Sequence, residues 1–258
     1  MNKIKVILAY PQVIFREGIH FILSGEEDFE VAGETKGNQE TLELIEANPP
    51  HVVVLSQADE KSAAAAVTRR IKAGYPAVSV IIITAENSVE NVFPSLIAGA
   101  SAAFTADTEP ERMVSIIREV AAGKLPIIGT LMMPPIATRA LTEFKDLATL
   151  NERLGIDMAL LSKKESDALA ALASGADPLQ VAARMGLDES ALEGLLRAVL
   201  QKLVSNDRAR AIIEKSQVTL PSFLHLPSLA GPEEYLTRQE FNEFKDSLMN
   251  AFRTLQKF

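Results

Sequence analysis

The first half of the chain alternates short apolar runs with segments of helical length, and this alternation constrains the fold more than any other feature. The pattern predicts strands at residues 3–9, 29–35, 52–56, 78–84 and 102–105 and helices at residues 13–24, 38–48, 59–73, 89–98 and 110–122. Parallel strands need crossover helices, so this alternation is typical of a parallel sheet covered on both faces. We therefore expect a flavodoxin-like, doubly wound, five-stranded α/β domain.

The third predicted strand ends at a residue that could carry function. Its apolar residues 52–55 lie between two prolines and a polar cluster, as expected for a strand buried on both faces, and it ends at Ser56. Ligands of open α/β sheets bind at the carboxyl ends of the strands. Ser56 is therefore a candidate functional residue, and a polar end to a buried strand is the plain alternative.

The composition excludes several kinds of chemistry. The 258 residues suit two domains, and the absence of cysteine excludes disulfides, thiolate catalysis and cysteine-based zinc sites. The three histidines are isolated from one another, which argues against a histidine metal site. No phosphate-binding loop, dinucleotide fingerprint or Gly-x-Ser-x-Gly elbow occurs. We expect no enzyme activity, no cofactor and no metal.

Charge and hydropathy predict where such a chain works. The first residues lead directly into a strand without a signal-peptide apolar region, and the most apolar runs have the length of a strand. We therefore expect a cytoplasmic protein without membrane contact. The formal net charge is −8 and no segment has an excess of basic residues, which argues against a nucleic-acid partner.

Short blocks in both halves of the chain resemble a known family. The first half contains IKVIL at 4–8, FREGI at 15–19, VAGE at 31–34 and AGAS at 98–101. The second half contains LSKKE at 161–165, AARMGL at 182–187 and KL at 202–203. In this order the blocks resemble the receiver and helix-turn-helix domains of LuxR/NarL-type (FixJ-like) response regulators, over about two-thirds of the chain.

The resemblance implies a phosphoryl-accepting pocket whose key groups are missing here. Such a receiver binds Mg²⁺ with an acidic pair after the first strand and with the acceptor aspartate that ends the third strand. The acidic pair falls on Tyr10 and Pro11, and the acceptor falls on Ser56. The switch threonine is kept as Thr84, and the phosphate-binding lysine falls on Ala106. We therefore expect an atypical, degenerate pseudo-receiver that is not phosphorylated on aspartate.

Two alternatives would restore chemistry to this pocket. Asp59, Glu86 or Asp107 could supply carboxylates from nearby loops, although each is also explained as a helix-start or solvent-facing residue. Ser56 could act as a nucleophile, but no base stands at a recognisable spacing from it. An inactive pocket is the favoured interpretation.

The second half predicts a helix-turn-helix with an unusual third helix. Ser162 and Glu165 form a capping box that opens the first helix, and Asp188 caps a third helix expected to end at residue 203. The resemblance implies that the third helix would face DNA with the residues Ser190, Ala191, Glu193, Gly194, Leu195 and Ala198. These offer almost no cations or hydrogen-bonding groups for a phosphate backbone or base edges, so this helix-turn-helix is also expected to be degenerate. Their small apolar strip suits another helix, with a packing role for Gly194, or it is an unused face.

Beyond residue 212 the resemblance stops, and a linker rich in proline and serine leads to a last predicted helix at 238–258. Thr237 and Glu240 form its capping box. Its contact face consists of Phe241, Phe244, Leu248, Phe252, Leu255 and Phe258. Their spacing predicts a coiled-coil seam or a helix that docks on its own chain, on a second subunit or on a partner, and closure of an ordinary core is the alternative.

The expected organisation is a pseudo-receiver at 1–125, a helical linker at 126–160, an all-α LuxR-type helix-turn-helix domain at 161–212 and a linker with a C-terminal helical extension at 213–258. The favoured function is phosphorylation-independent transcriptional or signalling control through a homodimer and protein–protein contacts. The resemblance implies that the predicted helices at 89–98 and 110–122 help to form the dimer contact, although their periodicity assigns most of their apolar residues to the core. The alternative is a DNA-binding LuxR-type transcription factor with a constitutively active receiver.

Overall fold

The computed structural model describes residues 3–57, 63–154 and 158–215. The first half contains β1 (Ile4–Ala9), α1 (Val13–Ser24), β2 (Phe29–Thr35), α2 (Asn38–Ala47), β3 (Val52–Ser56), α3 (Ala63–Gly74), β4 (Ser79–Thr84), α4 (Val89–Ile97), β5 (Ala102–Thr105) and α5 (Pro110–Ala121). The second half contains the 3₁₀ helix η1 (Pro126–Met132), α6 (Pro134–Leu154), α7 (Lys163–Ala173), α8 (Pro178–Arg184) and α9 (Glu189–Lys215).

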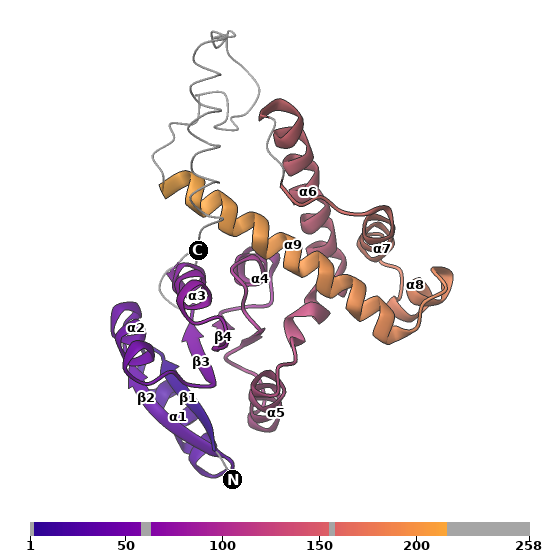
Figure 1. Ribbon diagram of the computed structural model, residues 1–258. Helices are drawn as coiled ribbons and strands as arrows, with labels where there is room; N and C mark the ends of the chain where they lie inside the picture. Colours follow the sequence, from indigo (N-terminus) through magenta and orange to yellow (C-terminus); the bar gives the residue numbers. More distant parts are fainter. Residues whose placement is uncertain (1–2, 58–62, 155–157, 216–258) are drawn as a thin grey trace.

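The five strands form one parallel sheet in the order β2-β1-β3-β4-β5, which confirms the predicted flavodoxin-like fold. Helices α1 and α5 pack on one face, with core residues such as Ile19 and Ile117. Helices α2, α3 and α4 pack on the other, with core residues such as Ile45, Ile71 and Leu96. Figure 1 shows this arrangement around the sheet. Strand β3 lies at the centre and its apolar residues are all buried, because both faces are covered.

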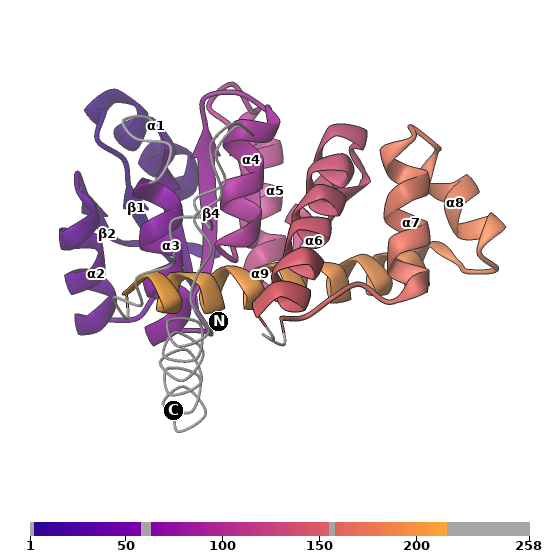
Figure 2. The same cartoon turned by 90° about the horizontal axis from the view of Figure 1, so that it is seen from above.

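The second half packs against the α2–α4 side of the sheet. One continuous apolar core joins residues of α3 and α4 to residues of η1, α6, α7 and α9, including Phe93, Leu131, Phe144 and Leu196. Figure 2 shows α9 passing along α4, α6 and α7 in turn. The receiver-like half and the helical half are therefore joined by a shared core as well as by the chain.

The local helix signals in the second half are confirmed. The Ser162 hydroxyl accepts from the Glu165 backbone N–H at 3.4 Å, and the Ser162 N–H donates to the Glu165 carboxylate at 2.6 Å. The Asp188 carboxylate accepts from the Ala191 N–H at 2.7 Å. Gly175 and Gly186 take positive φ angles of 86° and 69° after α7 and α8, a conformation that suits glycine at helix ends.

The third helix of the helix-turn-helix is longer than predicted. It was expected to end at residue 203, but α9 continues to Lys215 and crosses the predicted domain boundary at 212. The added turns are held by the first half of the chain: Asp207 pairs with Arg69 of α3, and Val204 lies over Gly99. Tertiary contacts therefore extend a helix whose local apolar pattern weakens. The domain boundaries themselves stay predictions.

The apolar residues of α4 and α5 are core residues, as their periodicity indicated. Val92, Phe93 and Leu96 of α4 are buried, and so are the apolar residues Met113, Ile116, Ile117 and Val120 of α5. Helix α4 is covered by α6 and α9 of the same chain. The guanidinium carbon of Arg139 in α6, for example, lies 5.5 Å from the centre of the Phe93 ring. Much of the surface expected to carry dimer contacts is therefore occupied within the chain.

Candidate functional site

The strand register brings the predicted pocket positions to one edge of the sheet. Ala9 pairs with Leu55, Ser56 with Ile83, and Thr84 with Thr105. Because all strands are parallel, Tyr10, Pro11, Ser56, Thr84 and Ala106 all lie at the carboxyl ends of β1, β3, β4 and β5. The structure thus assembles the positions that the sequence singled out, without the groups that phosphoryl transfer uses.

Two of these residues are buried and make hydrogen bonds within the fold. Tyr10 is buried, with 6% of its surface exposed, and its carbonyl accepts from the Arg16 guanidinium at 2.8 Å. The Thr84 hydroxyl is buried and donates to the Phe104 carbonyl at 3.4 Å. Ser56 and Pro11 are half-buried, and Ala106 is exposed.

Among the described residues, no carboxylate cluster forms at this edge. Over the ranges 3–57, 63–154 and 158–215, no group of three or more acidic, histidine or cysteine side chains is placed to hold a metal ion. Glu86 accepts from the Asn91 amide at 3.4 Å, and Asp107 is exposed. Asp59, the third suggested carboxylate, lies outside the described residues. The tyrosine, proline and serine at the three positions where the resemblance implies Mg²⁺ ligands do not fit this ion, which takes carboxylate oxygens.

Ion pairs between side chains of α1 and β2 hold these two elements together. Arg16 donates its Nε to the Glu34 carboxylate at 2.9 Å, and His20 contacts the other carboxylate oxygen through Nδ1. Burial acts to raise the pKa of Glu34, but the hydrogen bonds from His20 and Arg16 outweigh it, so this pKa lies below its usual value. This network was not predicted from the sequence, although Arg16 and Glu34 belong to two of the blocks that carry the family resemblance.

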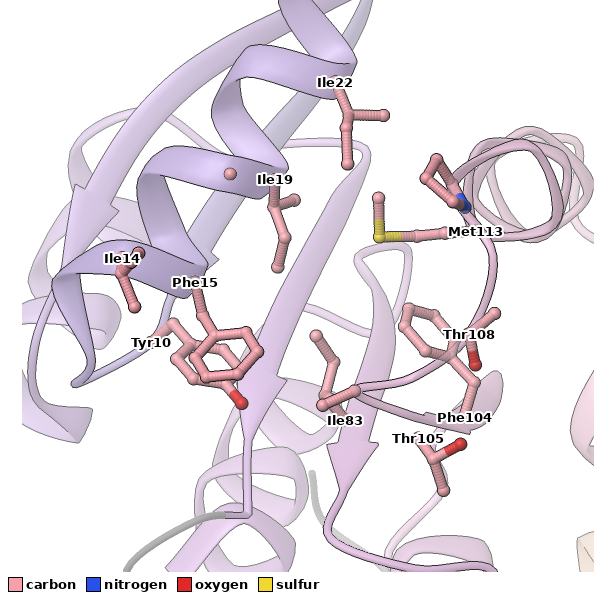
Figure 3. Close-up of a pocket in the computed structure, with 13 residues that line it drawn as sticks. Tyr10, Ile14, Phe15, Ile19, Ile22, Ile83, Phe104, Thr105, Thr108 and Met113 are labelled. Carbon is pink, nitrogen blue, oxygen red and sulfur yellow. The ribbon is translucent and has the colours of Figure 1, made fainter.

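A cavity of about 210 Å³ lies between α1 and α5 at the same edge of the sheet. It is lined by Tyr10, Ile14, Phe15, Gly18, Ile19, Ile22, Ile83, Phe104, Thr105, Ala106, Thr108, Pro110 and Met113. Figure 3 shows Tyr10 and Phe15 on one side of it and Phe104, Thr108 and Met113 on the other. The sequence analysis did not predict this cavity. The available signal was the apolar run Val13, Ile14 and Phe15, whose side chains are exposed.

The predicted third-helix face is open to solvent at its start. Ser190, Ala191, Glu193 and Gly194 are exposed, whereas Leu195 and Ala198 are half-buried. A packing role for Gly194 was expected, but a Cβ built at this position meets nothing within 4 Å among the described residues. No described residue packs against Gly194, because the helix turns it away from the core stripe of Leu192 and Leu196, and its packing role stays a prediction.

The cations of the same helix segment are already paired. Arg197 lies 3.4 Å from the Glu193 carboxylate, and Lys202 donates to Glu165 of α7 at 2.6 Å. Asp188 and Glu189 make the start of the helix acidic. A DNA phosphate would therefore approach a surface whose positive charges are engaged and whose remaining charges repel it.

The predicted contact face of the C-terminal helix lies outside the described residues. Within the described part of the chain, no helix is long and apolar enough to cross a membrane.

Comparison with known proteins finds relatives that cover most of this chain. No model of a protein family matches the chain. The uncharacterized transcriptional regulatory protein YhcZ of Bacillus subtilis is 29% identical over 210 residues, or 81% of this chain and 94% of YhcZ. DegU of Brevibacillus brevis is 23% identical over 83% of this chain and 93% of its own length. The nitrate/nitrite response regulator NarL of Escherichia coli is 22% identical over 81% and 93%.

Two solved structures of response regulators are also similar to this chain, at TM-scores below 0.5. A LuxR-family two-component response regulator from Aurantimonas sp. SI85-9A1 has a TM-score of 0.47 and 23% identity, covering 54% of this chain and 98% of that one. RcsB of Salmonella typhimurium has a TM-score of 0.45 and 20% identity, covering 79% and 93%.

The five-stranded parallel sheet with its covering helices has the fold of a receiver domain. The homologues of this chain are LuxR/NarL-type response regulators. YhcZ and DegU are transcriptional regulatory proteins.

Proposed function

We propose that the protein is a response-regulator-like regulator of transcription or signalling that works without phosphorylation of its receiver domain. It acts through a homodimer and contacts with a protein partner. One observation carries the proposal: Ser56 stands at the acceptor position, and Tyr10 and Pro11 stand at the metal-binding positions of the same sheet edge.

We expect no phosphoryl transfer at this edge because these residues lack the chemical groups that the reaction uses. A hydroxyl cannot form an acyl phosphate, and no carboxylate stands at the three positions where the resemblance places the ligands of the cation that neutralises charge on a transferring phosphoryl group. The phosphate-binding lysine position is held by Ala106, which brings no positive charge.

The docking of α9 supports a receiver that holds its effector domain without a phosphoryl signal. Asp207 of α9 pairs with Arg69 of α3, and Arg210 pairs with Glu143 of α6. Val204 packs over Gly99, with 3.5 Å between its Cγ1 and the position of a Cβ at the glycine. None of these three contacts involves a residue at the carboxyl edge of the sheet.

The described residues also supply an apolar surface for a partner. Ile14 and Phe21 of α1 are each 81% exposed, and Val13 and Phe15 extend the surface along the same helix. Exposed apolar surface of this kind is typical of protein contact sites. The predicted contact face of the C-terminal helix, which runs from Phe241 to Phe258, and the four-part division of the chain belong to the same proposal.

Incubation with acetyl phosphate and Mg²⁺, followed by intact-mass measurement, tests the absence of phosphorylation. We expect no mass increase for the wild type or for Ser56→Ala, while E. coli NarL serves as a positive control for the assay. Stoichiometric labelling of the wild type that Ser56→Ala abolishes would refute the proposal.

Light scattering tests the contact part of the proposal. We expect the full chain to be a dimer, and removal of the residues after Pro232 to lower the mass or abolish partner binding. Unchanged mass and unchanged partner binding would exclude the C-terminal helix from the contact.

The exposed start of α9 favours one alternative, a DNA-binding transcription factor with a constitutively active receiver. Ser190, Glu193 and Gly194 are not covered by the receiver-like half. Mobility-shift assays at several salt concentrations separate the two functions. A sequence-specific, salt-sensitive complex would favour the alternative, and the proposed function predicts none.

A further inference from the structure

The cavity between α1 and α5 has the size and position of a ligand site. Its volume is about 210 Å³, whereas an apolar cavity of about 150 Å³ in another protein binds benzene. It lies at the carboxyl edge of the sheet, where ligands of open α/β sheets bind. Space for about one or two fused rings is therefore available.

The lining selects a neutral and largely apolar molecule. The walls are aromatic at Tyr10, Phe15 and Phe104, and the sulfur of Met113 adds a polarizable surface. None of the thirteen lining residues carries a charge. An anion such as phosphate would lose its hydration without gaining a charged partner, so this lining disfavours it.

Tyr10 brings one polar group to the aromatic lining. The residue is 94% buried and lines the cavity. A tyrosine hydroxyl can both donate and accept a hydrogen bond. Arg16 holds the backbone of Tyr10 in place through the carbonyl, and Thr105 and Thr108 bring further hydroxyl groups to the cavity.

We propose that this cavity binds a small, neutral aromatic molecule whose single polar group hydrogen-bonds to the Tyr10 hydroxyl. The ligand would contact α1, α5 and the β5–α5 loop together and would so link the sheet edge to the exposed face of α1. The proposal goes beyond the phosphorylation-independent function. Labelling by acetyl phosphate would refute that function and leave the cavity proposal standing.

Indole is a suitable probe because the chain contains no tryptophan. Its fluorescence can be excited where tyrosine does not absorb, and burial in an apolar site shifts its emission to shorter wavelength. We expect a saturable shift with a dissociation constant on the order of 0.1–1 mM for a ligand of this size. No saturable shift in the millimolar range would overturn the proposal.

Gly18→Leu fills the cavity from α1. A Cβ at Gly18 meets nothing within 4 Å, and leucine is a better helix former than glycine, so this variant should fold. We expect it to abolish indole binding. Gly74→Leu is the matched control. A Cβ at Gly74 also meets nothing within 4 Å, but Gly74 lies in α3, away from the cavity. Equal indole binding by wild type and Gly18→Leu would contradict the assignment.

Tyr10→Phe tests the hydrogen bond alone. We expect this variant to bind indole about fivefold more weakly, as for the loss of one neutral hydrogen bond, and to bind the hydrocarbon indene as the wild type does. Equal indole affinity would refute the role of the hydroxyl. The wild type could instead be a dimer that both indole and the Phe21→Ser substitution dissociate. This result would assign the cavity to a side chain of a second copy and overturn the small-molecule proposal.

Discussion

The ion pair between Arg69 and Asp207 should provide a measurable part of the coupling between the two halves of the chain. The Arg69 guanidinium makes two hydrogen bonds to the Asp207 carboxylate, one of them 2.8 Å long. The side chains are 31% and 12% exposed, so the pair is neither fully solvated nor deeply buried. Two unit charges about 4 Å apart attract by roughly 4 kcal/mol at an effective dielectric constant near 20. Desolvation and the loss of side-chain freedom offset most of this. We expect a net coupling energy of about 1–2 kcal/mol, above the range of roughly 0.2–1 kcal/mol for exposed pairs.

A double-mutant cycle with Arg69→Met, Asp207→Asn and the double variant measures this energy. Urea denaturation followed by circular dichroism gives the free energy of unfolding of each protein. Each single variant should lose about 2 kcal/mol, as for a hydrogen-bonded charge that loses its partner. Arg70→Met is the matched control, because Arg70 is exposed on the next position of α3, and it should change stability by less than about 0.5 kcal/mol. A coupling energy below about 0.3 kcal/mol would refute the reasoning, since that is the error of additivity for independent sites.

Two further perturbations test the packing of the second half. Burial acts to raise the pKa of Glu165, but hydrogen bonds from Lys202 and Ser162 outweigh it and hold the pKa below its usual value. The stabilisation is therefore present above the ordinary pKa of a glutamate and is lost as the pH falls through the lower folded-state pKa. Glu165→Gln should flatten the acid limb of a stability–pH curve, and an unchanged acid limb would contradict this. Gly99→Ala should cost about 1–2 kcal/mol in urea denaturation, because Gly99 has a φ of +91° under Val204. Gly129→Ala, at a glycine with open space and no positive φ, is its control, and equal losses in the two variants would remove the conformational explanation.

The parts of the fold that follow from local pattern were predictable. The apolar run of β3 between Pro50 and Ser56 predicted a central strand, because only a strand covered on both faces keeps such a run. The Ser162–Glu165 capping box predicted the start of α7, because both of its hydrogen bonds lie within four residues of chain. The register of parallel strands then placed Tyr10 and Ser56 at one edge, as the family resemblance implied.

Contacts between distant residues were not predictable from pattern. Arg69 and Asp207 are 138 residues apart, and nothing in either local sequence indicates the other. The length of α9 depends on that contact and on Val204 over Gly99, so its local pattern underestimated it. The packing role expected of Gly194 stays a prediction, because no described residue lies within 4 Å of a Cβ at this position.

The sequence by itself determined which chemical groups stand at the sheet edge, since the chemistry of a serine or tyrosine side chain does not depend on the fold. It also determined the order of strands and helices, because periodicity and capping act within a few residues. The tertiary structure alone decided that α9 lies on α4 and η1, that Arg197 and Lys202 of α9 are paired, and that α1 and α5 leave a cavity beside Tyr10. These features depend on packing between segments far apart in the chain, where shape and distance decide which groups meet.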